Sequence, residues 1–189
     1  MTTYIGLLRG INVGGNKMVA MAELREMITA LGFTDVKTLL QSGNVVFRGP
    51  AKATVKLESQ LEAALEKRFG MHVDFHVRTA GEWLAIVEAN PFQVEAKKDP
   101  GHLLVTCFKA PLDQASVRAL REAIPGRETL HADGRHLYMM FPDGVGTSKA
   151  PALADKKLAA RGTARNWNTV MKLAALTAQP DEGRLKKKP

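Results

Sequence analysis

The sequence contains a single cysteine, Cys107, which excludes an intrachain disulfide and a zinc cluster built on several thiolates. It also lacks any apolar run close to the roughly 20 residues that a membrane-spanning helix needs. The first residues show neither the basic segment nor the cleavage site of a signal peptide. These absences predict a protein of the reducing cytoplasm that has no membrane partner.

Aromatic residues are scarce, at 6% of the chain, and none lies in a motif typical of RNA-binding sheets. Sheets that bind single-stranded nucleic acid stack its bases on exposed aromatic rings, and Tyr4 and Phe108 are the candidates in predicted strands. The five histidines show no metalloprotease spacing, so we expect no metal site, and no motif indicates a cofactor. Nucleic acid is therefore a less favoured partner than a small ligand.

Positive charge is concentrated near the C-terminus. Residues 1–148 carry 17 Lys or Arg and 16 Asp or Glu, a net charge of +1, whereas residues 149–189 carry 10 and 3, a net charge of +7. Part of this excess lies in residues 179–189, a basic tail that we predict to be disordered, and part lies where structure is expected. The structured part is either a solvated basic helix face or an anion-binding surface.

Hydrophobic periodicity predicts the same order of elements twice. In the first half, apolar runs and alternation indicate strands at residues 4–8, 36–40, 45–47 and 73–77, with helices at 21–31 and 57–69. In the second half, strands are predicted at 103–108, 129–131, 136–141 and 162–165, with helices after 113 and after 151. Each half then has the order βαββαβ, the split βαβ plait, with an antiparallel sheet. One larger mixed sheet is the alternative.

This reading divides the chain into two plaits with linking and C-terminal helices. We predict a first α/β plait at residues 1–78, a linking helix and loop at 79–100, and a second plait at 101–166. A C-terminal helix at 167–178 follows, and then the basic tail. The linking helix begins at a capping-box spacing, Thr79 to Glu82.

Two Gly-rich loops each connect a predicted strand to a predicted helix. The first begins with Arg9 directly after a strand and continues through Gly10, Asn12, Gly14 and Gly15. Glycines allow the backbone to approach a ligand closely, and free N–H groups at a helix start favour an anion. The spacing matches neither a dinucleotide-binding fingerprint nor a P-loop, and a tight strand-to-helix turn is the alternative.

The second Gly-rich loop, residues 144–149, ends in Ser148 and Lys149 near a helix start. A cation at that position is disfavoured by the helix dipole unless an anion is present, which indicates a ligand. A lysine on a solvated loop is the alternative.

Polar side chains also occupy the tight connection between the predicted hairpin strands, at Gln41, Ser42 and Asn44.

A third candidate segment joins the last predicted strand to the last helix. Arg165, Trp167 and Lys172 together are suited to clamp an aromatic, phosphorylated ligand by charge and stacking. The structural alternatives are that Trp167 anchors a core and that Asn166 or Asn168 caps the helix.

Three stretches resemble a known family: residues 7–16 (LLRGINVGGN), 40–47 (LQSGNVVF) and 164–170 (ARNWNTV). They are similar to the signature segments of the bacterial domain of unknown function 1697 family, in the expected order and across nearly the whole chain. Residues 146–149 (GTSK) are also similar to the family pattern. The resemblance implies two ferredoxin-like α/β plaits, and it implies no activity and no catalytic residues.

The leading hypothesis is the binding of a phosphate-bearing, nucleotide-like small ligand in a cleft between the two halves, where Arg9 and Lys149 meet. One alternative is a transferase or hydrolase acting on a phosphorylated metabolite, held by Arg9, Gln41, Asn44, Lys149 and Arg165. Another is a nucleic-acid-binding or purely structural protein. No activated nucleophile or acid–base pair is evident, so the sequence leaves open whether the protein is an enzyme, and it leaves open the oligomeric state.

Overall fold

A computed structural model describes residues 1–15 and 17–178 of the chain. The predicted tail, residues 179–189, lies outside the described residues. The first half contains the elements β1 (Thr2–Leu8), α1 (Met21–Ala30), β2 (Thr34–Leu39), β3 (Asn44–Gly49), α2 (Thr54–Phe69) and β4 (Phe75–Thr79). Its four strands form an antiparallel sheet in the order β2-β3-β1-β4.

The second half repeats this arrangement. Its elements are β5 (Leu103–Cys107), α5 (Gln114–Ala123), β6 (Thr129–Asp133), β7 (His136–Met140), α6 (Ala150–Lys157) and β8 (Thr163–Asn166). Its strand order, β6-β7-β5-β8, is the order of the first sheet when the strands are counted from β5. The fold is therefore two ferredoxin-like plaits with antiparallel sheets, as predicted, and the alternative of one larger mixed sheet is wrong.

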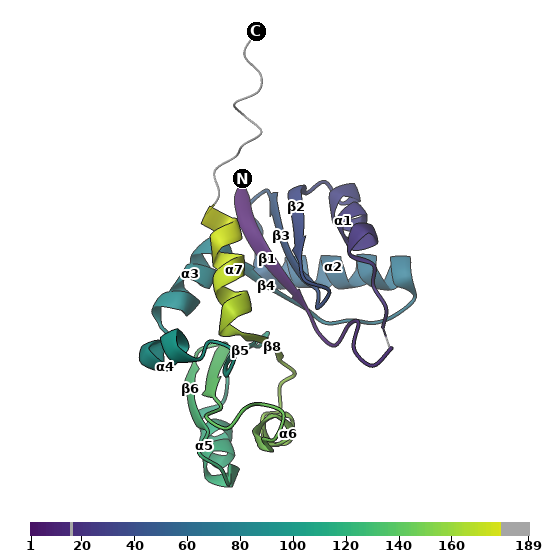
Figure 1. The fold of residues 1–189 in the computed structure, drawn as a ribbon. Coiled ribbons are helices and arrows are strands. Elements are labelled where there is room, and N and C mark those ends of the chain that lie inside the picture. Colours follow the sequence, from purple (N-terminus) through teal and green to yellow (C-terminus); the bar gives the residue numbers. More distant parts are fainter. Residues whose placement is uncertain (16, 179–189) are drawn as a thin grey trace.

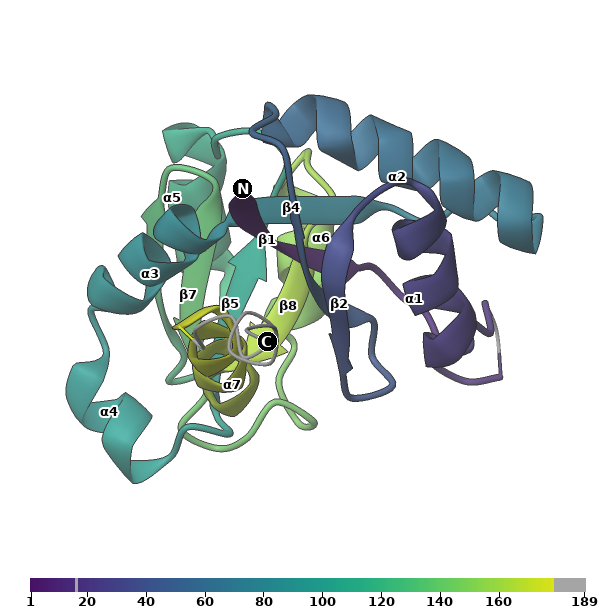
Figure 2. The same cartoon turned by 90° about the horizontal axis from the view of Figure 1, so that it is seen from above.

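Three more helices join and cover the plaits. They are α3 (Ala80–Glu88), α4 (Gln93–Lys98) and the C-terminal α7 (Trp167–Ala178). Figure 1 shows the first plait above the second, with α3 and α7 beside the first sheet. Figure 2 shows α1 and α2 on the side of the first sheet that faces away from α3 and α7.

The layers enclose three apolar cores. One core lies between the first sheet and α1 with α2, and another lies between the second sheet and α5 with α6. The third core joins the plaits: Ile5 and Leu7 from β1, Trp83 from α3, and Trp167 and Val170 from α7 are all buried in it. Because this shared core takes residues from both sheets, the plaits are packed against each other rather than only tethered.

Local signals set the ends of several helices as the sequence predicts. Thr79 and Glu82 form a reciprocal capping box at the start of α3. Gly70 ends α2 in the left-handed conformation, with φ of 67°. Asn166 caps α7, because its Oδ1 accepts hydrogen bonds from the backbone N–H and the hydroxyl of Thr169, both at 3.0 Å.

Strand β4 lies at an edge of the first sheet, and glutamates occupy its outer N–H groups. These bonds run from Phe75 to Glu62, from Val77 to Glu58 and from Thr79 to Glu82, each at 2.8 Å. An edge whose donors are already used does not pair with a strand of another chain. Within the described residues, no helix is long and apolar enough to cross a bilayer.

The turn between β2 and β3 requires glycine at position 43. Gly43 has a φ of +73°, and a Cβ there would lie 2.7 Å from side-chain atoms of Leu8 and Ile11. Gly134, in the hairpin turn between β6 and β7, also has positive φ, but nothing lies within 4 Å of its Cβ position. An alanine at position 43 would therefore suffer both backbone strain and steric overlap, whereas an alanine at position 134 would suffer backbone strain alone.

We expect Gly43→Ala to lower the free energy of unfolding by about 2–4 kcal/mol, because strain and overlap add. The matched control Gly134→Ala carries only the strain and should cost about 1 kcal/mol. Urea unfolding of both variants measures the difference. Equal losses in the two variants would contradict the overlap at Gly43.

Candidate functional site

Arg165 on β8 connects the ends of three strands from the first plait. Its Nε donates to Asn44 Oδ1 at 2.5 Å, and its Nη2 donates to the carbonyls of Leu8 at 2.8 Å and Ser42 at 3.0 Å. Burial lowers the pKa of this guanidinium to about 10. The acceptors are polar groups at the ends of β1, β2 and β3, so Arg165 holds the second plait against the first.

Asn44 completes this junction from the other side. It is fully buried, and its Nδ2 donates to Leu39 O at 2.8 Å and to Ser42 Oγ at 3.0 Å. Gln41 and Ser42 remain exposed at the tip of the turn. Asn44 and Arg165 therefore satisfy each other, which is a structural use of two predicted ligand residues.

The first Gly-rich loop is tied down by its asparagine. Asn12 Nδ2 donates to Val19 O at 3.0 Å and to Gln41 O at 2.7 Å, and Asn12 Oδ1 accepts from Val19 N at 2.8 Å. Three glycines of this loop, Gly10, Gly14 and Gly15, have positive φ and open space at their Cβ positions. Asn12 therefore ties this part of the loop to Val19 and to the β2–β3 turn.

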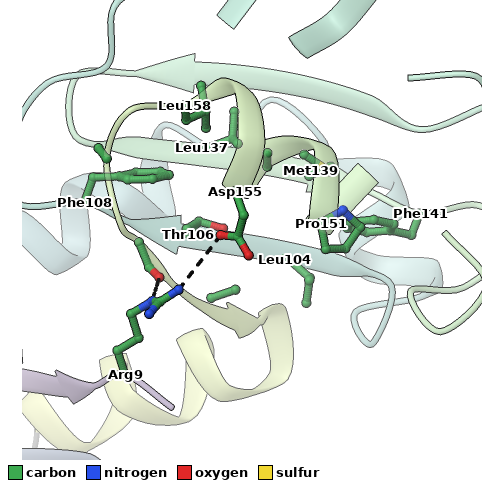
Figure 3. A pocket seen from close by; sticks show the side chains of 14 residues that line it. Arg9, Leu104, Thr106, Phe108, Leu137, Met139, Phe141, Pro151, Asp155 and Leu158 are labelled. Atoms are coloured by element: carbon green, nitrogen blue, oxygen red, sulfur yellow. Dashed lines mark hydrogen bonds and ion pairs between the residues drawn. The ribbon is translucent and has the colours of Figure 1, made fainter. Parts of the chain in front are cut away.

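Arg9 lies differently from Arg165, because part of its guanidinium is accessible. Its Nε donates to Gly162 O at 3.0 Å, and its Nη2 lies 4.0 Å from Asp155 Oδ1. The side chain is 34% exposed, and that of Asp155 is 72% exposed. Figure 3 shows Arg9 reaching from the end of β1 to Asp155, with apolar side chains of the second plait beyond it.

Beyond Arg9 is an apolar cavity of about 220 Å³ between α6 and the second sheet. It is lined by Arg9, Leu104, Thr106, Phe108, Leu137, Met139, Phe141, Pro151, Ala154, Asp155, Leu158, Ala160, Gly162 and Ala164. A wider and more polar hollow of about 480 Å³ adjoins it, lined by Arg9, Asp155, Lys156, Leu158, Ala159, Ala160 and Arg161. Arg9 and Asp155 line both spaces, so they mark the boundary between the apolar and the polar part.

Lys149 and Ser148 lie at the other end of α6. They line a separate hollow of about 250 Å³ together with Glu128 and Asp143. The Ser148 hydroxyl is hydrogen-bonded to the Glu128 carboxylate and accepts from Ala150 N. Lys149 precedes Asp155 by six positions, about 9 Å along a helix axis, and it lines none of the spaces that Arg9 lines.

The remaining predicted residues have structural positions. Trp167 is 8% exposed and lies in the core that joins the plaits, and Asn166 caps α7. Sequence reasoning missed three residues of the polar hollow: Asp155, Lys156 and Arg161. The only signal for them was the basic excess after residue 149, which does not say which side chains face one space.

A second polar cluster lies buried between the plaits. Arg78 on β4 is fully buried, and its Nε donates to His136 Nε2 at 2.9 Å while its Nη2 donates to Phe108 O at 2.6 Å. His76, two residues before Arg78, is also fully buried, and neither ring nitrogen has a hydrogen-bond partner. Burial, with Lys109 and Arg78 nearby, lowers the pKa of His76 to about 4. Burial beside Arg78 lowers that of His136 to about 4.

Within residues 1–15 and 17–178, no group of three or more His, Cys, Asp or Glu side chains is arranged to hold a metal ion. Cys107 is buried in the shared core, and burial raises the pKa of its thiol. A buried thiol of this kind is poorly suited to nucleophilic attack. The charged side chains at the boundary of the apolar cavity and the polar hollow are those of Arg9 and Asp155.

Fold and geometry define an α+β protein of two packed ferredoxin-like plaits with a cationic mouth on an apolar cavity. A family model, described as protein of unknown function (DUF1697), matches residues 1–138. The chain therefore belongs to the DUF1697 family, as the resemblance predicted, and the motifs at residues 7–16 and 40–47 lie within the matched part.

The fold is similar to the solved structure of the conserved bacterial protein SP0830 from Streptococcus pneumoniae. The TM-score is 0.65 at 26% sequence identity, and the match covers 93% of this chain and 98% of that one. No curated protein matches this chain. The comparisons thus establish family and architecture and name no ligand.

The buried junction at Arg165 predicts a large loss of stability in Arg165→Ala. Removing the guanidinium leaves the buried Asn44 Oδ1 without this donor and leaves Leu8 O with the long 3.4 Å bond from Thr163 Oγ1, so the free energy of unfolding should fall by about 2–3 kcal/mol. The control Arg118→Ala, at an exposed position of α5, should change it by less than about 0.5 kcal/mol. Thermal or urea unfolding measures both, and similar losses in the two variants would contradict the role of Arg165.

The cluster around Arg78 predicts acid sensitivity. An unfolded histidine binds its proton near pH 6.5, whereas in the folded protein the pKa values of His76 and His136 are about 4. Between these pH values the unfolded state binds more protons than the folded state. The free energy of unfolding should therefore be highest above pH 6.5 and should fall as the pH is lowered towards 4. The measurement is the urea midpoint from pH 7.5 to pH 4.

His76→Leu provides the matched variant, because leucine is of similar size and cannot take up a proton. It also removes two unpaired ring nitrogens, so we expect no loss of stability at low pH and a shallower dependence on pH. A dependence as steep as that of the parent protein would exclude His76 as a source of the acid sensitivity.

Proposed function

We propose that this protein binds a small phosphate-bearing ligand beside α6 of the second plait, at the point that Arg9 of the first plait reaches, with the phosphate at Arg9. The observation that carries the proposal is the accessible guanidinium of Arg9 at the boundary between a polar hollow and an apolar cavity. A guanidinium fork matches two phosphate oxygens, and its hydrogen bonds to an anion are charge-assisted.

Charge around the polar hollow supports an anion. The lining contains three cationic side chains and one carboxylate, so its formal charge is +2. The cations are Arg9, Lys156 and Arg161, and the carboxylate is that of Asp155. The Arg9–Asp155 pair is long, at 4.0 Å, and largely exposed at Asp155, and such a pair contributes little to stability. A phosphate therefore competes with Asp155 for Arg9 at low cost.

Nucleic acid is less well supported as the ligand. Tyr4 and Phe108, the aromatic candidates for stacking on bases, are buried at 0% and 3% exposure. The faces of both sheets in the described chain are covered by helices or by the shared core. A small ligand at Arg9 needs no exposed sheet, so it suits this architecture better.

A binding role is also better supported than catalysis. Apart from Arg9, Asp155 and Thr106 are the lining residues of the apolar cavity with polar side chains. Neither is paired with a histidine there, so neither has the partner that would activate it as a nucleophile or a general base.

The purely structural alternative describes Asn44 and Arg165 well, but it assigns no role to the accessible part of Arg9.

Arg9→Ala should weaken binding of phenyl phosphate, measured by isothermal titration calorimetry at low salt, by about 10- to 100-fold. Asp155→Asn should strengthen it a few-fold, because the competing carboxylate is gone. The control Arg68→Ala removes an equally charged side chain from α2, where it pairs with Glu23 and Glu26 away from the cavity, and should leave the affinity unchanged. An unchanged affinity in Arg9→Ala, with the fold intact by circular dichroism, excludes the proposed site.

A further inference from the structure

The part of the cavity behind Arg9 is lined mainly by hydrocarbon side chains. Its side chains are mainly aliphatic and aromatic: Leu104, Phe108, Leu137, Met139, Phe141 and Leu158. Thr106 contributes the one hydroxyl of the lining. The floor is formed by β5 and β7, which are both interior strands, so their backbone groups are engaged in the sheet.

Such a lining discriminates against a nucleobase. Every nucleobase carries several ring or exocyclic nitrogen and oxygen atoms that lose their water when buried. A buried polar group without a partner costs about as much as a tenfold or larger loss of affinity. A threonine hydroxyl donates one hydrogen bond and accepts at most two, whereas an alkyl or aryl group needs no partner.

Where α6 lines the cavity its side chains are short: Pro151, Ala154 and Asp155, whereas its Leu153 packs against the core outside the lining. In the first plait, α2 occupies the position between the third and fourth strands and buries Leu57, Leu61 and Leu65 against the sheet. In the second plait, α6 has the same position with half as many residues, 8 against 16, and Ala150 is its one buried residue. Ala154 faces the cavity, so the volume that leucines occupy in the first plait is left open in the second.

The size of the cavity limits the hydrocarbon. An apolar cavity of about 150 Å³ in another protein stays dry and binds benzene. The cavity here, at about 220 Å³, has room for one phenyl ring or an alkyl chain of about six carbons. Its mouth at Arg9 and Asp155 opens into the polar hollow, so a chain inside places its head group beside Lys156 and Arg161.

We infer that the ligand is an alkyl or aryl phosphate, with its hydrocarbon part in the apolar cavity and its phosphate in the polar hollow. The inference rests on the proposed function for the phosphate and adds the chemical class of the remainder. Selectivity follows from burial: each methylene that enters the cavity should raise affinity about three- to fourfold, until the cavity is full.

The test is a calorimetric series with inorganic phosphate, methyl, butyl, hexyl and octyl phosphate, phenyl phosphate and adenosine monophosphate. Affinity should rise with chain length to about six carbons and then level off, and adenosine monophosphate should bind no better than methyl phosphate. A flat series, or tighter binding of the nucleotide, overturns the hydrocarbon assignment. If phosphate binding still depends on Arg9 in that case, the proposed function stands.

Absence of binding by every phosphate overturns both proposals, and a neutral probe then identifies which part failed. Binding of hexan-1-ol alone would show an apolar cavity with no anion site. Ala154→Leu gives a complementary result, because the added side chain fills the cavity from α6. It should abolish the dependence on chain length while inorganic phosphate still binds.

The matched control for this variant is Ala152→Leu, two residues away on α6, at an exposed position outside the cavity lining. It should retain the full chain-length dependence. Thermal unfolding of both variants confirms that each is folded. An unaltered chain-length dependence in Ala154→Leu would mean that the hydrocarbon binds elsewhere, and the assignment to this cavity would be withdrawn.

Discussion

The half-buried guanidinium of Arg165 determines how the two plaits meet. It is a charge in a largely apolar junction, and it is tolerated because the Asn44 side chain and two backbone carbonyls accept its hydrogen bonds. These acceptors lie at strand ends of the first plait, whereas Arg165 lies on the last strand of the second. The register between the two sheets is therefore set by polar geometry as well as by the apolar contacts of Trp83 and Trp167.

The same junction forms the mouth of the cavity. Leu8, whose carbonyl accepts from Arg165, immediately precedes Arg9, and Gly162, which accepts from Arg9, lies three residues before Arg165. A Cβ at Gly162 would lie 2.5 Å from Thr106 and 2.7 Å from Phe108, so glycine permits this close approach. The Asn44–Arg165 pair and Arg9 are thus neighbours in one arrangement.

Much of the architecture was predictable, because it depends on contacts that are local in sequence. Alternation in residues 73–77 indicated the region of β4, and the Thr79 and Gly70 signals identified helix ends. The short helix α4 was missed, because six residues with one buried alanine carry too little periodicity to detect. The candidate site was predicted less well. Arg9 lines the cavity and stays a predicted ligand residue, whereas Asn44 and Arg165 are hydrogen-bonded to each other in the junction between the plaits.

The sequence alone determined the two βαββαβ units, their antiparallel sheets and the family, because hydrophobic period, turn residues and short motifs are read over a few residues at a time. Only the tertiary structure decided which cations share a space. Arg9 meets Lys156 and Arg161, whereas Lys149 lies at the opposite end of α6. That outcome depends on how two sheets pack through a core shared by distant segments, and on an unfilled volume beneath a short helix. Neither quantity is encoded in the spacing of neighbouring residues.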